Sequence, residues 1–170
     1  MADLRDDLRA HLGGRVCLVG IGNPDQGDDA LGVRLAEGMR ARGYPDVIVA
    51  ARTPERCVES LAQGPFQAVL FLDAVEMAAS PGAAVFLESH EMVTRYPQVS
   101  THKISLGTLA RLIERNGRTR VFLLGVQPES APATADLSVP VKTTLAILQD
   151  LLAEVLPVKP EALTVCGERP

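Results

Sequence analysis

Short apolar runs alternate with amphipathic stretches along most of the chain. Runs rich in aliphatic residues predict strands over 16–21, 47–51, 68–72, 83–87 and 120–126. Between them, apolar residues recur three or four positions apart, which is typical of helices that pack on a sheet. These stretches predict helices over 30–42, 55–62, 106–113 and, opened by Ser138 and Pro140, as far as residue 155.

Strands that alternate with helices predict right-handed crossovers and a mainly parallel sheet covered on both faces. The connection 73–82 has no helical period, so the strands before and after it could form a hairpin, which would make the sheet mixed. We therefore expect a single three-layer α/β domain with a five-stranded twisted sheet, of the phosphorylase/hydrolase-like type. It would span residues 16–156, after a charged leader (1–15) and before a surface tail (157–170).

Composition narrows the class of protein. The 170 residues, 46% of them apolar, suffice for one domain with a real core. The 17 basic and 21 acidic residues give 17 − 21 = −4, which argues against a nucleic-acid-binding groove. No apolar run reaches the ~18 residues of a membrane span, and the acidic opening MADLRDDLRA does not resemble a signal peptide. Three widely spaced cysteines (Cys17, Cys57 and Cys166) indicate reduced thiols and a cytoplasmic protein.

Polar residues follow several of the predicted strands. In an open α/β sheet, ligands bind beyond the carboxyl ends of the strands. Here those ends lead into residues 20–29, into Asp73 and into residues 127–130, and the polar loop 100–103 precedes a predicted helix. We therefore expect the functional site of the protein to lie at this edge of the sheet.

The first of these segments contains Gly20 and Gly22 and invites a nucleotide-binding interpretation. The third glycine of the dinucleotide fingerprint is replaced by Asp25, no lysine is present, and the acids of the loop would repel phosphate. The sequence thus argues against nucleotide binding. The glycines still predict a sharp turn that another group approaches closely.

Two carboxylates and one imidazole are the strongest candidates for a site. Asp28 and Asp29 precede a helix, and since one cap needs one carboxylate, the other is free for a different role. Asp73 ends an apolar strand, where it either caps the next turn or meets a cation or several N–H donors. His102 lies in a polar loop; we assign no role to His11 or His90.

Such a set could act in two ways. Mixed oxygen and nitrogen donors suit Zn²⁺, Ni²⁺, Mn²⁺ or Fe²⁺, and three protein ligands leave a position open for substrate. The same three groups could instead serve as acid, base and orienting group without a metal. The residues alone do not separate these two hypotheses.

Four segments resemble the [NiFe]-hydrogenase maturation endopeptidases in order and spacing. They are GIGNxxxGDDAxG from Gly20, Leu72-Asp73-Ala74 with a following Pro81-Gly82, Ser100-Thr101-His102, and LGVQPE from Leu124. The resemblance spans about residues 16–156. It implies an enzyme that removes the C-terminal extension of a hydrogenase large-subunit precursor once nickel has been inserted.

The resemblance also implies roles for individual residues. The metal-binding positions of the family fall on Asp29, Asp73 and His102, and the nickel would be carried by the substrate, with a surrogate divalent metal as a possible replacement. Gly20, Gly22 and Asn23 would contact the substrate, and Gln127 and Glu129 would line the cleft. No catalytic residue follows from the sequence, because a metal-activated water and a metal that only positions the substrate both remain open.

The chain also departs from the family. Asp29 stands where many members have Glu, and residues 49–52 (VAAR) stand where the family often has Asp-Gly-Gly followed by Ser or Thr, which could mark a divergent substrate. Two alternatives stay open. One is a non-catalytic nickel-sensing assembly protein, since no conventional nucleophile–base pair is evident. The other is a peptidyl-tRNA hydrolase-like enzyme, which the Gly20–Pro24 opening resembles but the negative charge disfavours.

Overall fold

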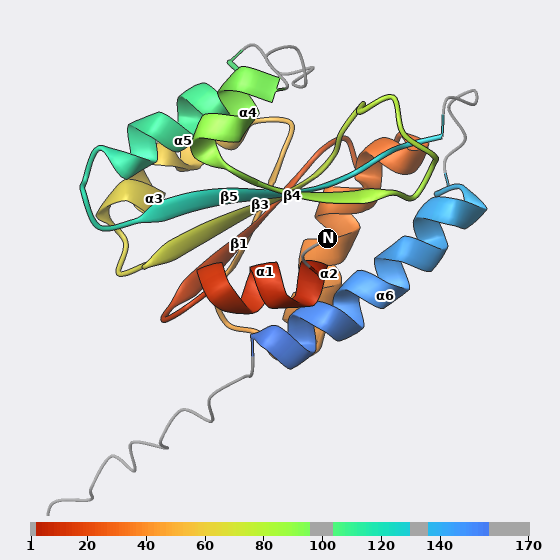
Figure 1. The fold of residues 1–170 in the computed structure, drawn as a ribbon, viewed down its shortest axis with the longest axis horizontal. Coiled ribbons are helices and arrows are strands. Elements are labelled where there is room, and N and C mark those ends of the chain that lie inside the picture. The colour runs from red at the N-terminus through yellow and green to blue at the C-terminus, as the bar shows by residue number, and fades with distance from the viewer. Residues whose placement is uncertain (1–2, 96–103, 130–135, 157–170) are drawn as a thin grey trace, which may run out of the picture.

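The computed structural model describes residues 3–95, 104–129 and 136–156. Its strands form one sheet, and helices lie on both faces of that sheet (Figure 1). They are α1 (Leu4–His11), β1 (Val16–Ile21), η1 (Gly27–Ala30), α2 (Leu31–Ala41), β2 (Val47–Ala51), η2 (Pro54–Cys57), α3 (Val58–Gln63), β3 (Ala68–Ala74), β4 (Ala84–Glu88), α4 (Ser89–Arg95), α5 (Leu106–Glu114), β5 (Arg120–Val126) and α6 (Val139–Val155).

The sheet has the strand order β2-β1-β3-β5-β4. Strands β2, β1, β3 and β5 are parallel, and β4 runs antiparallel to β5. The predicted mainly parallel five-stranded sheet is therefore confirmed, and it is mixed; the hairpin suggested between β3 and β4 is wrong, because β5 lies between them. The connection crosses the end of β5, where Val75 N–H donates to Val126 and Gln127 N–H donates to Ala83.

Two hydrophobic cores lie on opposite faces of the sheet. Alternate residues of one strand point to opposite faces, so Leu70 and Leu72 of β3 pack in one core while Val69 and Phe71 pack in the other. Helices α1, α2 and α6 cover the first core, and α3, α4 and α5 cover the second (Figure 1). This arrangement is the predicted three-layer α/β domain. None of the helices in the described ranges is both long and apolar enough to cross a membrane.

The first residues of the chain pack onto this domain. Asp3 caps α1 by accepting a hydrogen bond from the Arg5 N–H. Leu8 of α1 is fully buried in the core beneath α6. The segment expected to be a separate charged leader thus contributes a helix to one of the two covering layers. Pro157 and the expected tail 157–170 lie outside the described residues.

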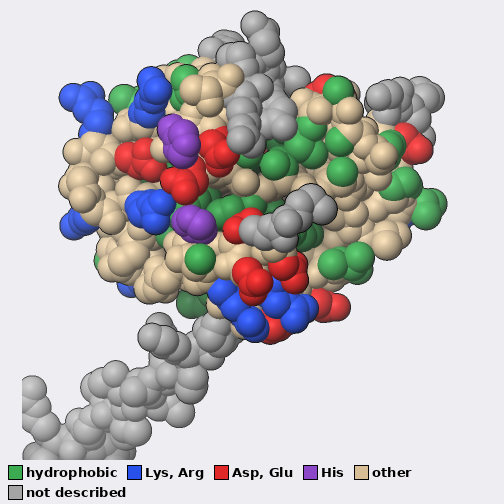
Figure 2. Space-filling view, viewed as in Figure 1, with side chains coloured by type: hydrophobic (Ala, Val, Ile, Leu, Met, Phe, Trp, Pro, Cys, Tyr) green, Lys and Arg blue, Asp and Glu red, His purple; other side chains and the backbone are tan. Residues whose placement is uncertain are grey.

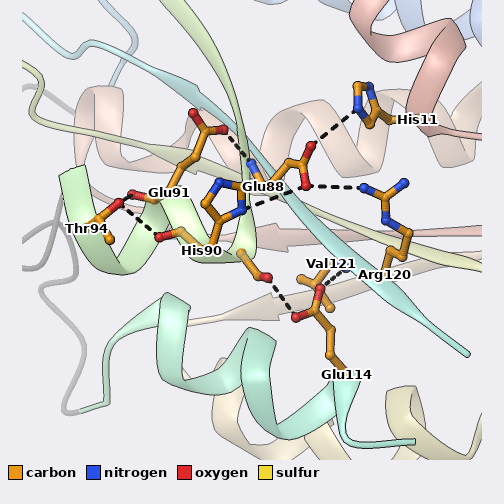
Figure 3. Close-up of polar contacts among 9 residues, drawn as sticks. His11, Glu88, His90, Glu91, Thr94, Glu114, Arg120 and Val121 are labelled. Atoms are coloured by element: carbon orange, nitrogen blue, oxygen red, sulfur yellow. Dashed lines mark hydrogen bonds and ion pairs between the residues drawn. The ribbon is translucent and has the colours of Figure 1, made fainter. Parts of the chain in front are cut away.

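The helix α4 has no counterpart among the predicted elements, because its short sequence carries no apolar stripe. It begins directly after Glu88, whose carboxylate lies between Arg120 (3.2 Å), His11 (3.4 Å) and His90 (3.8 Å) (Figure 3). Figure 2 shows histidine side chains among acidic ones where this Glu88 cluster reaches the surface. Glu88 pairs with Phe122 in the sheet, near the beginning of β5, so the cluster lies toward the end of the sheet where the parallel strands start.

A candidate site at the carboxyl edge

The parallel strands β1, β3 and β5 are neighbours, and they end at the same edge of the sheet, which we call the carboxyl edge. The residues that follow them therefore meet in space although they are far apart in sequence. The helix α5 also begins here, because it precedes β5 and runs back across the sheet. The carboxyl edge thus gathers most of the polar residues that the sequence singled out.

Gly22 makes the sharp turn that leaves β1. Its φ of +125° is a conformation that L residues other than glycine rarely adopt. Its N–H donates to the Ala51 carbonyl at the end of β2 (3.1 Å), and a side chain at this position would overlap the carbonyl oxygen of Asp29. The group that approaches the turn closely is therefore the backbone of the protein's own η1 helix. The turn holds Asp29 against the end of β1.

The Asp29 side chain folds back over the same loop. Its Oδ2 accepts a hydrogen bond from the Asn23 N–H at 2.9 Å. The helix that follows has Ala30 at its N-cap and no side-chain cap, so the prediction that one of Asp28 and Asp29 caps it is wrong. This carboxylate instead organises the turn and remains partly exposed.

Asp73 is the penultimate residue of β3 and is only 3% exposed. Its Oδ1 accepts a hydrogen bond from the N–H of Ala74 (2.9 Å) and would lie 3.8 Å from a Cβ added at Gly22. Burial, and secondly the nearby charge of Asp29, raise the pKa of Asp73 well above its usual range. The structure therefore brings Asp29 and Asp73 together, and Asp73 is hard to ionise there because it is buried and lies near the charge of Asp29.

This carboxylate pair suits a bound cation. Within the described residues, no Lys, Arg or His side chain bonds to either carboxylate, so only backbone N–H groups, and no cation, stabilise their charge. A divalent cation would do so, because carboxylate oxygens are good ligands for such ions. No group of three potential ligands gathers in the part of the chain that the structure describes. The predicted third ligand, His102, lies in the segment 96–103, outside the described residues.

The other two histidines cannot supply the missing donor. The sequence contains three histidines in all. His11 and His90 both lie beside Glu88, toward the opposite end of the sheet (Figure 3). If an imidazole joins Asp29 and Asp73, it must therefore come from His102.

Asp28 has a structural role that the sequence did not reveal. Its carboxylate accepts hydrogen bonds from the Glu129 N–H (2.8 Å), the Ser138 N–H (2.6 Å) and the Ser138 hydroxyl (2.8 Å). It thereby joins the loop after β1 to the segment after β5 and to the residue that precedes α6. The two adjacent acids therefore have different roles: Asp28 links distant segments through hydrogen bonds, and Asp29 faces Asp73.

Gln127 is almost completely buried, and its amide bonds entirely within the protein. Its Oε1 accepts from the N–H groups of Met77 (2.7 Å) and Ala79 (3.3 Å), and its Nε2 donates to Glu76 and to the Pro128 carbonyl. These bonds hold the connection between β3 and β4 at the carboxyl edge. Contact of Gln127 with a substrate stays a prediction, as it does for the exposed Glu129.

Gly20 allows close packing beneath the site. A Cβ added there would lie 2.6 Å from the Ala36 Cβ and 2.7 Å from the Gly32 carbonyl oxygen, both in α2. The helix can therefore approach β1 closely because Gly20 has no side chain. The predicted contacts of Gly20, Gly22 and Asn23 with a substrate stay predictions.

The described cysteines are poor nucleophiles. Cys17 is buried inside β1, and burial raises its pKa to about 12. Burial also raises the pKa of Cys57. Since the thiolate is the nucleophilic form, neither residue forms a reactive cysteine centre at the carboxyl edge.

Comparisons with known proteins agree with the fold and with the resemblance of the sequence. A model of the family HycI, hydrogenase maturation protease, matches residues 31–155. A [NiFe] hydrogenase maturation protease HycI from Thermococcus kodakarensis is 30% identical, with a TM-score of 0.77, over 88% of this chain and 98% of that chain. No curated protein sequence matches.

Two further solved structures share the fold. The endopeptidase HycI from Escherichia coli is 23% identical (TM-score 0.69; 81% of this chain and 88% of that chain). The hydrogenase maturating endopeptidase HybD from E. coli is 20% identical (TM-score 0.70; 84% and 92%). Together with the family match over most of the sequence, these findings show that the chain belongs to the hydrogenase maturation protease family.

Proposed function

We propose that this enzyme removes the C-terminal extension from the precursor of a [NiFe]-hydrogenase large subunit in the cytoplasm, after nickel has been inserted. The observation that carries the proposal is the pair Asp29 and Asp73 at the carboxyl edge, to which no Lys, Arg or His side chain of the described ranges bonds. A nickel ion carried by the substrate would supply the missing positive charge. The enzyme would then engage a metal-loaded precursor and discriminate against an empty one.

His102 would complete the set of ligands. The segment that contains it joins α4 to α5, two helices on the same face of the sheet. Asp73 follows Phe71 by two positions and Val69 by four along β3, so its side chain is on the same face of the sheet as theirs, and α5 begins at the carboxyl edge of that face. Two carboxylates and one imidazole leave positions open on the nickel for ligands from the precursor.

The surrounding residues would shape the cleft. Gly22 and Asn23 would line its floor next to Asp29, and Gly20 would let α2 pack closely beneath. Gln127 would act by holding the connection between β3 and β4 in place, and Glu129 would stand at the exposed rim. Two routes to cleavage use this set: a water activated by the substrate's metal, or a metal that only positions the peptide bond.

The test is cleavage of the precursor, measured by mass spectrometry with nickel-loaded and nickel-free substrate. We expect the wild type to shorten only the loaded precursor. His102→Ala is expected to abolish cleavage without unfolding the protein. His90→Ala is the matched control, because it removes an exposed imidazole from the Glu88 cluster and is expected to leave cleavage unchanged.

Other outcomes would contradict the proposal. Normal cleavage by His102→Ala would remove that residue from the site. A wild-type protein that retains the loaded precursor without shortening it would instead be a nickel-sensing assembly protein. If nuclease treatment releases the partner that the protein captures in a pull-down, the peptidyl-tRNA hydrolase-like alternative would be favoured.

A further inference from the structure

The chain leaves β2 through a strained turn at the carboxyl edge. Ala51, the last residue of β2, has a φ of +48°, which residues other than glycine seldom adopt. Its carbonyl accepts the Gly22 N–H, so the surrounding structure holds it in place. The backbone of the next residue, Arg52, is therefore fixed beside the turn at Gly22, which faces Asp73.

The Arg52 side chain is available to a ligand. It is exposed, and it makes no hydrogen bond or ion pair with any residue in the described ranges. β2 is an edge strand, so no other strand of this sheet covers its outer side. Arg52 also does not neutralise Asp73: among the described residues, only the N–H of Ala74 lowers the pKa of this carboxyl.

Acidic side chains lie along the same carboxyl edge of the sheet as Arg52. The loop after β1 carries Asp25 and Asp29, and Glu129 is exposed after β5. A substrate segment with a negative side chain is repelled along this rim and attracted only where a cation stands. A guanidinium suits this task, because its planar array of donors pairs with both oxygens of a carboxylate.

We propose that Arg52 is a specificity residue that binds a carboxylate of the precursor, in the segment next to the cleaved bond. The carboxylate is an acidic side chain or the terminal carboxylate of the extension. The inference rests on the proposed function, because it assumes that a precursor is cleaved at the carboxyl edge. It concerns how the peptide is recognised, whereas Asp29, Asp73 and His102 concern the metal.

The experiment compares cleavage by the wild type, Arg52→Lys, Arg52→Gln and Arg52→Glu, with the initial rate measured against precursor concentration. We expect Arg52→Gln to raise KM about threefold to tenfold and Arg52→Glu to raise it further, with kcat nearly unchanged. Arg52→Lys is expected to retain part of the affinity. Arg115→Glu is the matched control: it makes the same charge change at an exposed position at the end of α5, away from the carboxyl edge.

Substrate variants identify the carboxylate. If it is a side chain, changing one particular Asp or Glu of the precursor to its amide raises KM for the wild type but not for Arg52→Glu. Changing that acid to Lys then restores cleavage by Arg52→Glu. If it is the chain terminus, amidation of the terminal carboxylate has the effect instead.

The outcomes separate this inference from the proposed function. If the wild type cleaves the loaded precursor and Arg52→Glu has the same KM as Arg115→Glu, the inference about Arg52 is wrong and the proposed function stands. A fall in kcat without a change in KM would also overturn it, since a binding role would then be excluded. If the wild type cleaves nothing, the proposed function fails and the inference fails with it. Equal thermal unfolding midpoints of the variants show that the comparison is made between folded proteins.

Discussion

Gly22→Ala tests whether the turn after β1 positions the carboxylate pair. An added methyl group would overlap the carbonyl oxygen of Asp29, and ordinary contact begins only at 3.4 Å. The backbone around Asp29 must therefore move by on the order of 1 Å, an overpacking that costs about 1–3 kcal/mol. The φ of +125° adds roughly 1–2 kcal/mol, because an L residue is strained there. The sum is a loss of about 2–5 kcal/mol in the free energy of unfolding.

We expect Gly22→Ala to impair precursor cleavage more strongly than it impairs folding. A domain of this size has a stability of about 5–15 kcal/mol, so we expect the variant to remain folded at 25 °C. A shift of about 1 Å in Asp29 is expected to lower the rate of precursor cleavage about 100-fold. Urea unfolding monitored by circular dichroism measures the first quantity, and mass spectrometry of the precursor measures the second.

Gly43→Ala is the control for backbone strain. Gly43 also has a positive φ, of +90°, but nothing lies within 4 Å of an added Cβ. It is expected to lose only the roughly 1–2 kcal/mol of strain and to cleave at the wild-type rate. Equal losses of stability in the two variants, or full activity in Gly22→Ala, would refute the reasoning that close packing against Asp29 makes this glycine necessary.

Three further changes test other parts of the structure. Asp73→Asn is expected to abolish cleavage yet stabilise the fold at pH 7 by on the order of 1–3 kcal/mol. Because the pKa of Asp73 is raised, the wild type loses stability as the pH rises above about 4, whereas the variant does not. Urea unfolding at several pH values measures this difference. Gln127→Ala is expected to cost about 2 kcal/mol and to speed thermolysin cleavage between β3 and β4, because the N–H groups of Met77 and Ala79 lose their acceptor; unchanged proteolysis would contradict this role. Leu8→Ala should cost about 2–5 kcal/mol in thermal unfolding if α1 belongs to the domain, and a loss below about 0.5 kcal/mol would show that it does not.

The regular elements could be predicted from local patterns. The bounds of β1, β2 and β5 follow from apolar runs, and Ser105 caps α5 as its position suggests, with its hydroxyl accepting the Thr108 N–H. Elements without such patterns were missed. The helix α4 has no apolar stripe, and α1 is amphipathic but highly charged, so its buried Leu8 did not stand out.

The candidate site was predictable only in outline. Asp29 and Asp73 follow or end buried parallel strands, and neighbouring strands of that kind must deliver their last residues to one edge. The different roles of Asp28 and Asp29 were not predictable, because both residues precede the same helix and only their hydrogen-bond partners distinguish them. The bonds of Gln127 to the connection after β3 were likewise not predictable, because they join segments far apart in the sequence.

The amino-acid sequence by itself determined the α/β class, the family and the edge of the sheet where the candidate site residues gather, because hydrophobic periodicity and local motifs are properties of short stretches. The tertiary structure alone decided that β5 separates β3 from β4, that Asp73 is buried near Asp29 and its pKa is therefore raised, and that Arg52 pairs with no other described residue at the same edge of the sheet. These features depend on which distant segments become neighbours, and that is settled by packing over the whole domain.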